Sequence, residues 1–213
     1  MPTPIILLLA AIGAAWGFAS DRIAARWPAH EDGSIRPVDW RTPVAVAVGA
    51  VSLALVPVRF PSDVVAAVIF GLYVLALVLL LATDLDQRLL PNEITLPAIP
   101  LAFLVSLLGF NPLVAPSVLP IAAVVAIVIP LLLWLLAKPF GAGAIGQGDL
   151  KLLVSVGLLA GPLRMFTGVV YGALLAGIVI VVLLAVRRIT LKTFIPFGPF
   201  LIIGALWAIL VLE

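Results

Sequence analysis

The 213-residue sequence contains no cysteine and only one histidine, and just 10% of its residues are charged. The lack of cysteine excludes disulfide bonds and zinc sites built on thiolates. Soluble domains carry about 25% charged residues, so a chain with this few cannot cover its surface in water. Hydrophobic residues make up 64% of the sequence, and the mean hydropathy is +1.34. These values exclude a soluble enzyme and a disordered chain, and they indicate a membrane protein.

The sequence also lacks a strong excess of either charge. Twelve Lys and Arg residues stand against ten Asp and Glu residues, which leaves a formal net charge of +2. So small an excess does not indicate a nucleic-acid partner, because binding to the phosphate backbone depends on many basic groups. We therefore expect membrane lipid as a partner and no nucleic acid.

Long apolar runs are what the sequence has in abundance. A helix needs about 20 mostly apolar residues to cross a bilayer, with a range of about 17 to 25. Such runs predict an all-α membrane protein, a polytopic bundle of about eight transmembrane helices. The expected segments are 4–20, 43–58, 62–83, 93–109, 118–137, 148–161, 163–186 and 196–212. They occupy nearly the whole chain, so we expect residues 1–213 to form a single membrane-embedded domain.

The basic residues predict the orientation of the bundle. Loops on the cytosolic side of a membrane are enriched in Lys and Arg. If the N-terminus is outside, all the basic residues except Arg59 and Arg164 fall in cytosolic loops or at cytosolic helix ends. Removing any one span would disrupt this alternation. The pattern therefore supports eight spans and an N-terminus outside.

Four acidic residues lie at the predicted cytosolic ends of spans, namely Asp84, Asp86, Glu93 and Asp149. Asp84 and Asp86 are two residues apart, so on a helix they point to different faces and cannot form a working pair. A structural interpretation pairs Asp84 with Arg88 one turn later and makes Asp149 an N-cap or first-turn acid. A functional interpretation has one acid from each of two helices facing the other.

Two acids on different helices at one membrane face suggest an aspartic protease. Neighbouring carboxylates share a proton, so one acts as a base on water while the other donates to the scissile carbonyl. A small transporter is the alternative from another class, with Asp84 and Asp149 carrying protons or cations. Short discontinuous helices, such as the one expected at 148–161, occur in transporters.

Four stretches of the sequence resemble the bacterial type IV prepilin peptidases, leader peptidases of the membrane GxGD aspartic protease group. Asp84–Pro97, reading DLDQRLLPNEITLP, resembles the first catalytic motif, and Gly146–Leu153, reading GQGDLKLL, resembles the GxGD motif. Ile195–Gly204, reading IPFGPFLIIG, resembles the closing helix, and Gly17–Pro28 is a weaker match to the end of the first helix. The first two motifs are specific in combination.

The resemblance implies that Asp84 and Asp149 are the two catalytic aspartates. The residues expected to support them from neighbouring loops are Pro91, Gly146, Gly148 and Lys151. Members of the family cleave the basic leader from type IV prepilins or pseudopilins at the cytosolic face of the bacterial inner membrane. A related alternative is a GxGD intramembrane protease with another substrate, such as remnant signal peptides.

Family members often also N-methylate the new N-terminus with S-adenosylmethionine, and many carry two cysteine pairs for zinc in the first cytosolic loop. Here that loop, residues 20–42, is short and offers only His30 as a nitrogen or sulfur ligand. A structural zinc site needs four such ligands. We therefore expect no metal and no cofactor for proteolysis. The short loop also favours loss of methylation, with S-adenosylmethionine as the methyl donor if that activity is retained.

Overall fold

The computed structural model describes residues 3–29, 33–140, 145–190 and 196–212. Within these ranges the chain forms eight α-helices and one short 3₁₀ helix, with no strand. The helices are α1 (Thr3–Ala24), α2 (Arg41–Arg59), α3 (Val64–Gln87), α4 (Asn92–Leu107), α5 (Leu119–Ala137), η1 (Lys138–Phe140), α6 (Gln147–Ala160), α7 (Pro162–Ala185) and α8 (Gly198–Leu210). Each predicted apolar segment corresponds to one of the α-helices, so the expected all-α polytopic fold is confirmed.

The helices differ in length. Five of them (α1, α2, α3, α5 and α7) are long and apolar enough to cross a membrane. The other three, α4, α6 and α8, have 16, 14 and 13 residues. At 1.5 Å per residue α6 is only about 21 Å long, shorter than a hydrocarbon layer of about 30 Å. Polar backbone at the ends of such helices is tolerated in a membrane only where protein surrounds it.

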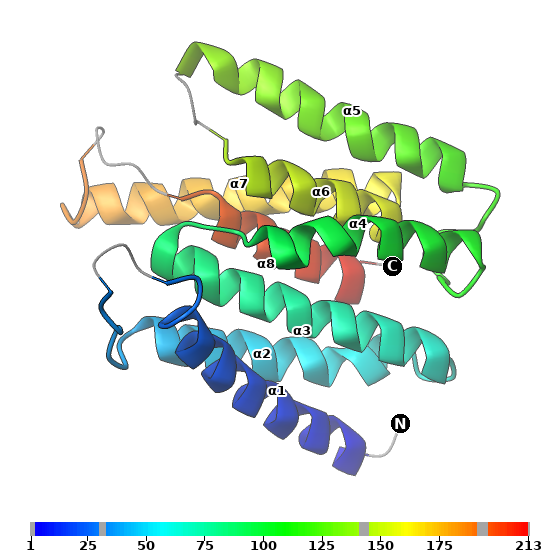
Figure 1. The fold of residues 1–213 in the computed structure, drawn as a ribbon, viewed down its shortest axis with the longest axis horizontal. Helices are drawn as coiled ribbons and strands as arrows, with labels where there is room; N and C mark the ends of the chain where they lie inside the picture. The colour runs from blue at the N-terminus through cyan, green and yellow to red at the C-terminus, as the bar shows by residue number, and fades with distance from the viewer. Residues whose placement is uncertain (1–2, 30–32, 141–144, 191–195, 213) are drawn as a thin grey trace.

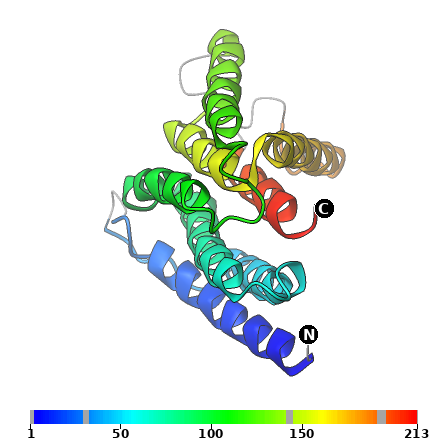
Figure 2. The same ribbon diagram turned by 90° about the vertical axis from the view of Figure 1, so that its right-hand side faces the viewer.

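Two of the short helices, α6 and α8, are largely surrounded by the others, whereas α4 lies at the edge of the bundle (Figures 1 and 2). Nine of the fourteen residues of α6 and ten of the thirteen of α8 are buried. α8 packs against α3, and both α6 and α8 share one hydrophobic core with it. The largest fully buried side chains of this core include Phe70, Leu77 and Leu81 of α3, Leu152 and Leu159 of α6, and Ile202 and Ile209 of α8. The middle of the molecule is therefore built by α3, α6 and α8.

The helices alternate in direction, so that α3 ends where α4, α6 and α8 begin, on the left in Figure 1. We call this the Asp84 end of the bundle. Of the eleven basic residues that the structure describes, nine lie at the Asp84 end, and only Arg59 and Arg164 lie at the other. The segregation of charge is the one that the sequence predicts. Lys192, His30 and the first residue of the closing-helix motif, Ile195, lie outside the described residues.

Candidate active site

Asp84 lies in the last turn of α3, with 4% of its surface exposed. The helix stops three residues later because Arg88 adopts the left-handed conformation, with φ 56°, that often ends helices. Buried Pro91 then precedes the first residue of α4 as its N-cap. The turn from α3 to α4 therefore holds Asp84 at the end of the core rather than in a solvated loop.

Asp149 is the third residue of α6 and is 8% exposed. The N-cap position belongs to Gly146, so of the two structural roles predicted for Asp149 the structure shows the first-turn acid. Its carboxylate turns back along the helix toward Gly146, since a Cβ built on that glycine would lie 3.3 Å from Oδ2 of Asp149. A negative side chain in this position is stabilised by the helix dipole. The helix end thus orients one side of the carboxylate.

Gly148 allows the start of α6 to approach the turn between α3 and α4. A Cβ on Gly148 would lie 2.7 Å from the Cβ of Leu90, which is too close for real side chains. On the exposed side of the same contact, Lys151 donates a hydrogen bond to the Asn92 side chain at 2.6 Å. The predicted supporting residues therefore join α6 to the turn that carries Asp84.

The two carboxylates meet at a third residue, Gly198, the first residue of α8. A Cβ built on Gly198 would lie 2.5 Å from Oδ2 of Asp84 and 3.0 Å from Oδ1 of Asp149. The distance between Oδ2 of Asp84 and Oδ1 of Asp149 therefore cannot exceed the sum of these two distances. One water molecule that hydrogen-bonds to both oxygens can bridge a gap of that size. The structure thus brings together the two aspartates that the sequence singled out, although they are far apart along the chain.

Oδ2 of Asp84 is buried and has no hydrogen-bond partner among the described residues. Native proteins leave few buried polar atoms unpaired, because each loses its hydrogen bonds to water without replacement. Here the unpaired atom is the one that faces Gly198 and Asp149. The oxygen is therefore available to a water or a substrate group rather than committed to holding the fold.

Asp86 has a different environment, although it is only two residues from Asp84. Its side chain is 2% exposed and accepts hydrogen bonds from Arg36 and Arg41. Arg36 also pairs with Asp21 of α1 and with Asp39. Burial lowers the pKa of the Arg36 guanidinium, but hydrogen bonds and attraction from Asp21 and Asp86 outweigh it, so the pKa is raised overall. The loop between α1 and α2 is thereby fastened to α3.

Sequence reasoning missed both Gly198 and the Arg36 network. The motif that contains Gly198 was recognised, but nothing in it indicated contact with the aspartates. The alternation of arginine and aspartate between positions 21 and 41 was the available signal for the network. Its partner Asp86 lies 50 positions from Arg36 and could not be assigned without the fold.

The fold and the site together define a polytopic helical membrane protein with a buried pair of aspartates at one end of its bundle. The model of the Type IV leader peptidase family matches residues 71–186, a range that includes both Asp84 and Asp149. The chain belongs to the Type IV leader peptidase family, so the resemblance found in the sequence is confirmed. Gly198 lies beyond the matched range.

Curated relatives agree with this assignment. A prepilin leader peptidase/N-methyltransferase of Pseudomonas putida is 35% identical over 171 residues, which are 78% of this chain and 57% of the relative. Proteins of the same name from Burkholderia pseudomallei and Xanthomonas campestris are 33% and 30% identical, over 79% and 66% of this chain and 54% and 49% of their own. The chain therefore spans about half the length of these relatives. No solved structure matches it.

Proposed function

We propose that this protein is a membrane aspartic endopeptidase that removes the basic leader from type IV prepilins or pseudopilins. The observation that carries the proposal is the convergence of Oδ2 of Asp84 and Oδ1 of Asp149 on Gly198. Membership of the Type IV leader peptidase family and the names of the relatives support the substrate class.

The chemistry follows from two carboxylates that share one proton. The ionised carboxylate takes a proton from a water molecule, whose oxygen attacks the scissile carbonyl carbon, while the protonated carboxylate donates to the carbonyl oxygen. The tetrahedral diol then collapses: one hydroxyl returns its proton to the pair as the carbonyl re-forms, the C–N bond breaks, and the leaving amine takes up a proton from the pair, which again holds one proton. Because the pair titrates as a unit, either aspartate can begin the cycle as the acid.

The proposal places the Asp84 end of the bundle in the cytosol of a bacterium, with the helices in the inner membrane. Nine of the eleven described basic residues lie at that end. Positive charge is retained on the cytosolic side of membranes, and this applies equally to a basic leader on the substrate. The scissile bond would then reach the interface beside the apolar segment that follows the leader.

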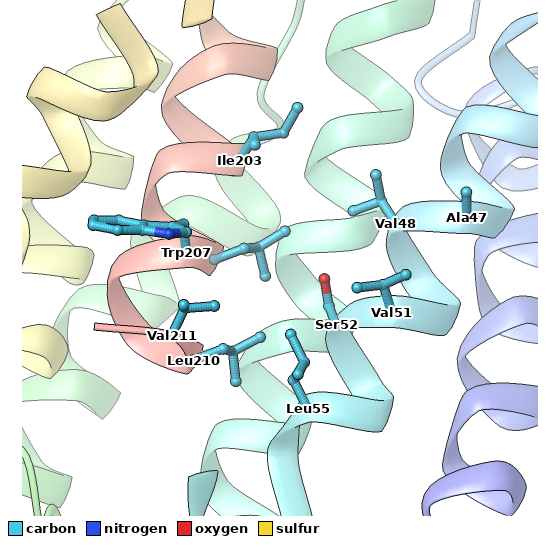
Figure 3. Close-up of a pocket in the computed structure, with 10 residues that line it drawn as sticks. Ala47, Val48, Val51, Ser52, Leu55, Ile203, Trp207, Leu210 and Val211 are labelled. Atoms are coloured by element: carbon cyan, nitrogen blue, oxygen red, sulfur yellow. The ribbon is translucent and has the colours of Figure 1, made fainter. Parts of the chain in front are cut away.

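Methyl transfer is a separate activity, and neither of the two grooves described below fits S-adenosylmethionine well. That molecule needs polar partners for its adenine, its ribose and its amino-acid end, as small-molecule sites usually provide. Figure 3 shows a groove of about 330 Å³ between α2 and α8, in which Ser52 is the one hydroxyl-bearing side chain. A second groove, of about 400 Å³ between α3 and α4, is also largely apolar, with Glu93 and Tyr73 as its polar side chains. We therefore propose proteolysis without methylation.

Structural zinc fits the chain no better. The sequence has no cysteine, and the described residues contain no group of three or more His, Asp or Glu side chains that could hold an ion. In the place where relatives of the family are expected to carry zinc, the loop between α1 and α2 is fastened by the ion pairs of Arg36. We propose that these ion pairs, and not a metal, hold the loop.

The test is a cleavage assay with purified protein in detergent or liposomes. The substrate is a prepilin-type peptide with its basic leader, and mass spectrometry of both products measures the cut. We expect release of an intact leader and a mature peptide. A signal-peptide substrate, assayed in parallel, tests the alternative of a GxGD intramembrane protease with another substrate. A proton-flux assay in the same liposomes tests the alternative of a small transporter. Flux without cleavage would contradict the proposal.

Labelled S-adenosylmethionine added to the same reaction tests the second activity. We expect cleavage without label on the mature N-terminus. Label on that residue would show that methylation is retained.

A further inference from the structure

The backbone conformation at position 198 does not require glycine, yet the chain has Gly198 there. Glycine is usually needed where φ is positive or where another group approaches the Cα closely. Among the described residues the glycines with positive φ are Gly33, Gly109 and Gly161, so Gly198 has an ordinary φ. A glycine at the start of a helix also loses more conformational entropy on folding than other residues would. The reason for glycine at this position must therefore be steric.

What approaches Gly198 is the aspartate pair itself. The three atoms nearest to a Cβ built there are Oδ2 and Cγ of Asp84, at 2.5 and 2.8 Å, and Oδ1 of Asp149, at 3.0 Å. Another glycine of the same helix, Gly204, differs in this respect, because its nearest atoms are backbone atoms of Gly168 and Gly172 in α7. Gly204 serves helix packing, whereas the atoms nearest to a Cβ on Gly198 belong to the carboxylates.

The neighbouring residues hold Gly198 in place. Phe197 is the N-cap of α8, and its carbonyl accepts hydrogen bonds from the backbone N–H groups of Phe200 and Leu201. Pro199 and Leu201 are buried beside it. Since the first turn of α8 is formed and buried, and the nearest atoms are the ends of two flexible side chains, a side chain at Gly198 would displace the carboxylates first.

We propose that Gly198 is a positioning residue for the aspartate pair: its missing side chain leaves the space in which Asp84 and Asp149 face one another. The expected effect of Gly198 on cleavage rests on the proposed function. Its expected effect on the positions of the carboxylates does not. A methyl group at this position separates the carboxylates, and a misplacement of about 1 Å in a catalytic group costs about 10²-fold in rate.

The kinetic test compares Gly198→Ala with Gly177→Ala. Gly177 lies in α7, and a Cβ there has no atom within 4 Å, so it changes the same residue type without a contact. We expect Gly198→Ala to lower kcat for leader cleavage by at least about 100-fold, with KM changed less than about twofold. Gly177→Ala should keep both constants. Wild-type kcat in Gly198→Ala would overturn the proposal.

A double-mutant cycle tests the contact without any reference to activity. Asp84→Ala removes the two nearest atoms, so of the three atoms that crowd the methyl group of Gly198→Ala only Oδ1 of Asp149 remains. We expect Gly198→Ala to lower the Tm, and we expect that loss to shrink by at least half in the Asp84→Ala background. An equal loss in both backgrounds would contradict the proposal. The cycle also remains informative if Gly198→Ala folds poorly, since Asp84→Ala should then restore its yield.

The two readouts separate the failure of this inference from that of the proposed function. If wild-type protein does not release a leader but the cycle shows coupling, the positioning role stands and the substrate assignment fails. If the wild type cleaves and the cycle shows no coupling, the positioning role fails alone.

Discussion

The guanidinium of Arg36 donates to the carboxylate of Asp86, which lies two residues along α3 from Asp84. Because of this ion pair, the two aspartates of the DLDQ sequence, Asp84 and Asp86, have different roles. Asp86 is held by Arg36 and Arg41, whereas Asp84 faces Asp149 and Gly198 with an oxygen that has no hydrogen-bond partner among the described residues. The division gives each of these residues a separate prediction.

Asp84→Asn and Asp149→Asn should each reduce leader cleavage by at least about 10²- to 10⁴-fold, the range for loss of a general acid or base. An amide has nearly the same shape as a carboxylate but cannot exchange the proton that the reaction needs. Both variants should keep the yield, helix content and Tm of the wild type within a few degrees. If either variant cleaves the leader near the wild-type rate, the substituted aspartate is not one of the catalytic pair.

Asp86→Asn should keep substantial cleavage activity but destabilise the protein. It removes a charge that two arginines face at a buried position, and weakening a buried charged hydrogen bond costs about 1.5–3 kcal/mol. Thermal unfolding measures the loss, with the exposed acid Glu93→Gln as the matched control. An inactive Asp86→Asn beside an active Asp84→Asn would reverse our assignment within this motif.

Paired cysteines should report the proximity of the two aspartates directly. The chain contains no cysteine, so Asp84→Cys combined with Asp149→Cys introduces the only two thiols. A short bifunctional thiol reagent should join them, because the two side chains meet at Gly198. Cross-linking is measured by the mass of the intact protein. The pair Asp86→Cys with Asp149→Cys is the control, and equal cross-linking of both pairs would speak against the geometry.

Gln87→Cys and Gln147→Cys test the membrane orientation. Gln87 ends α3 and Gln147 begins α6, so both lie at the Asp84 end. We expect them to react with a thiol reagent only once it reaches the cytosol. Arg164→Cys, at the start of α7 on the opposite side, should react with an impermeant reagent in intact cells. Labelling of Gln87→Cys by the impermeant reagent in intact cells would show that the topology is the reverse of the one proposed.

Chelators should not inhibit cleavage, and the purified protein should carry no stoichiometric zinc. The aspartates need no metal for the proposed steps, and the chain supplies too few nitrogen and sulfur ligands for a structural site. Metal analysis of the purified protein and the cleavage rate with and without chelator are the two measurements. A stoichiometric metal whose removal abolishes cleavage would show that another ligand set exists.

The sequence by itself determined the membrane fold. The position of each span follows from apolar residues summed over a local window of about 20, and the expected orientation follows from basic residues counted in adjacent loops. Both are properties of neighbouring residues, so no knowledge of packing is needed. For the same reason the sequence could place Asp84 and Asp149 at the ends of helices that reach the same side.

Only the tertiary structure decided what those residues contact. Asp84 and Asp149 come within reach of one another because α3, α6 and α8 pack around a common core, and Gly198 leaves room between them. Asp86 could equally have been a solvated charge, and its pairing with Arg36 joins segments 50 positions apart. Hydrophobicity drives each helix into the bilayer, but it does not choose neighbours there, since lipid is as apolar as a helix face. That choice depends on close packing and polar contacts between distant segments.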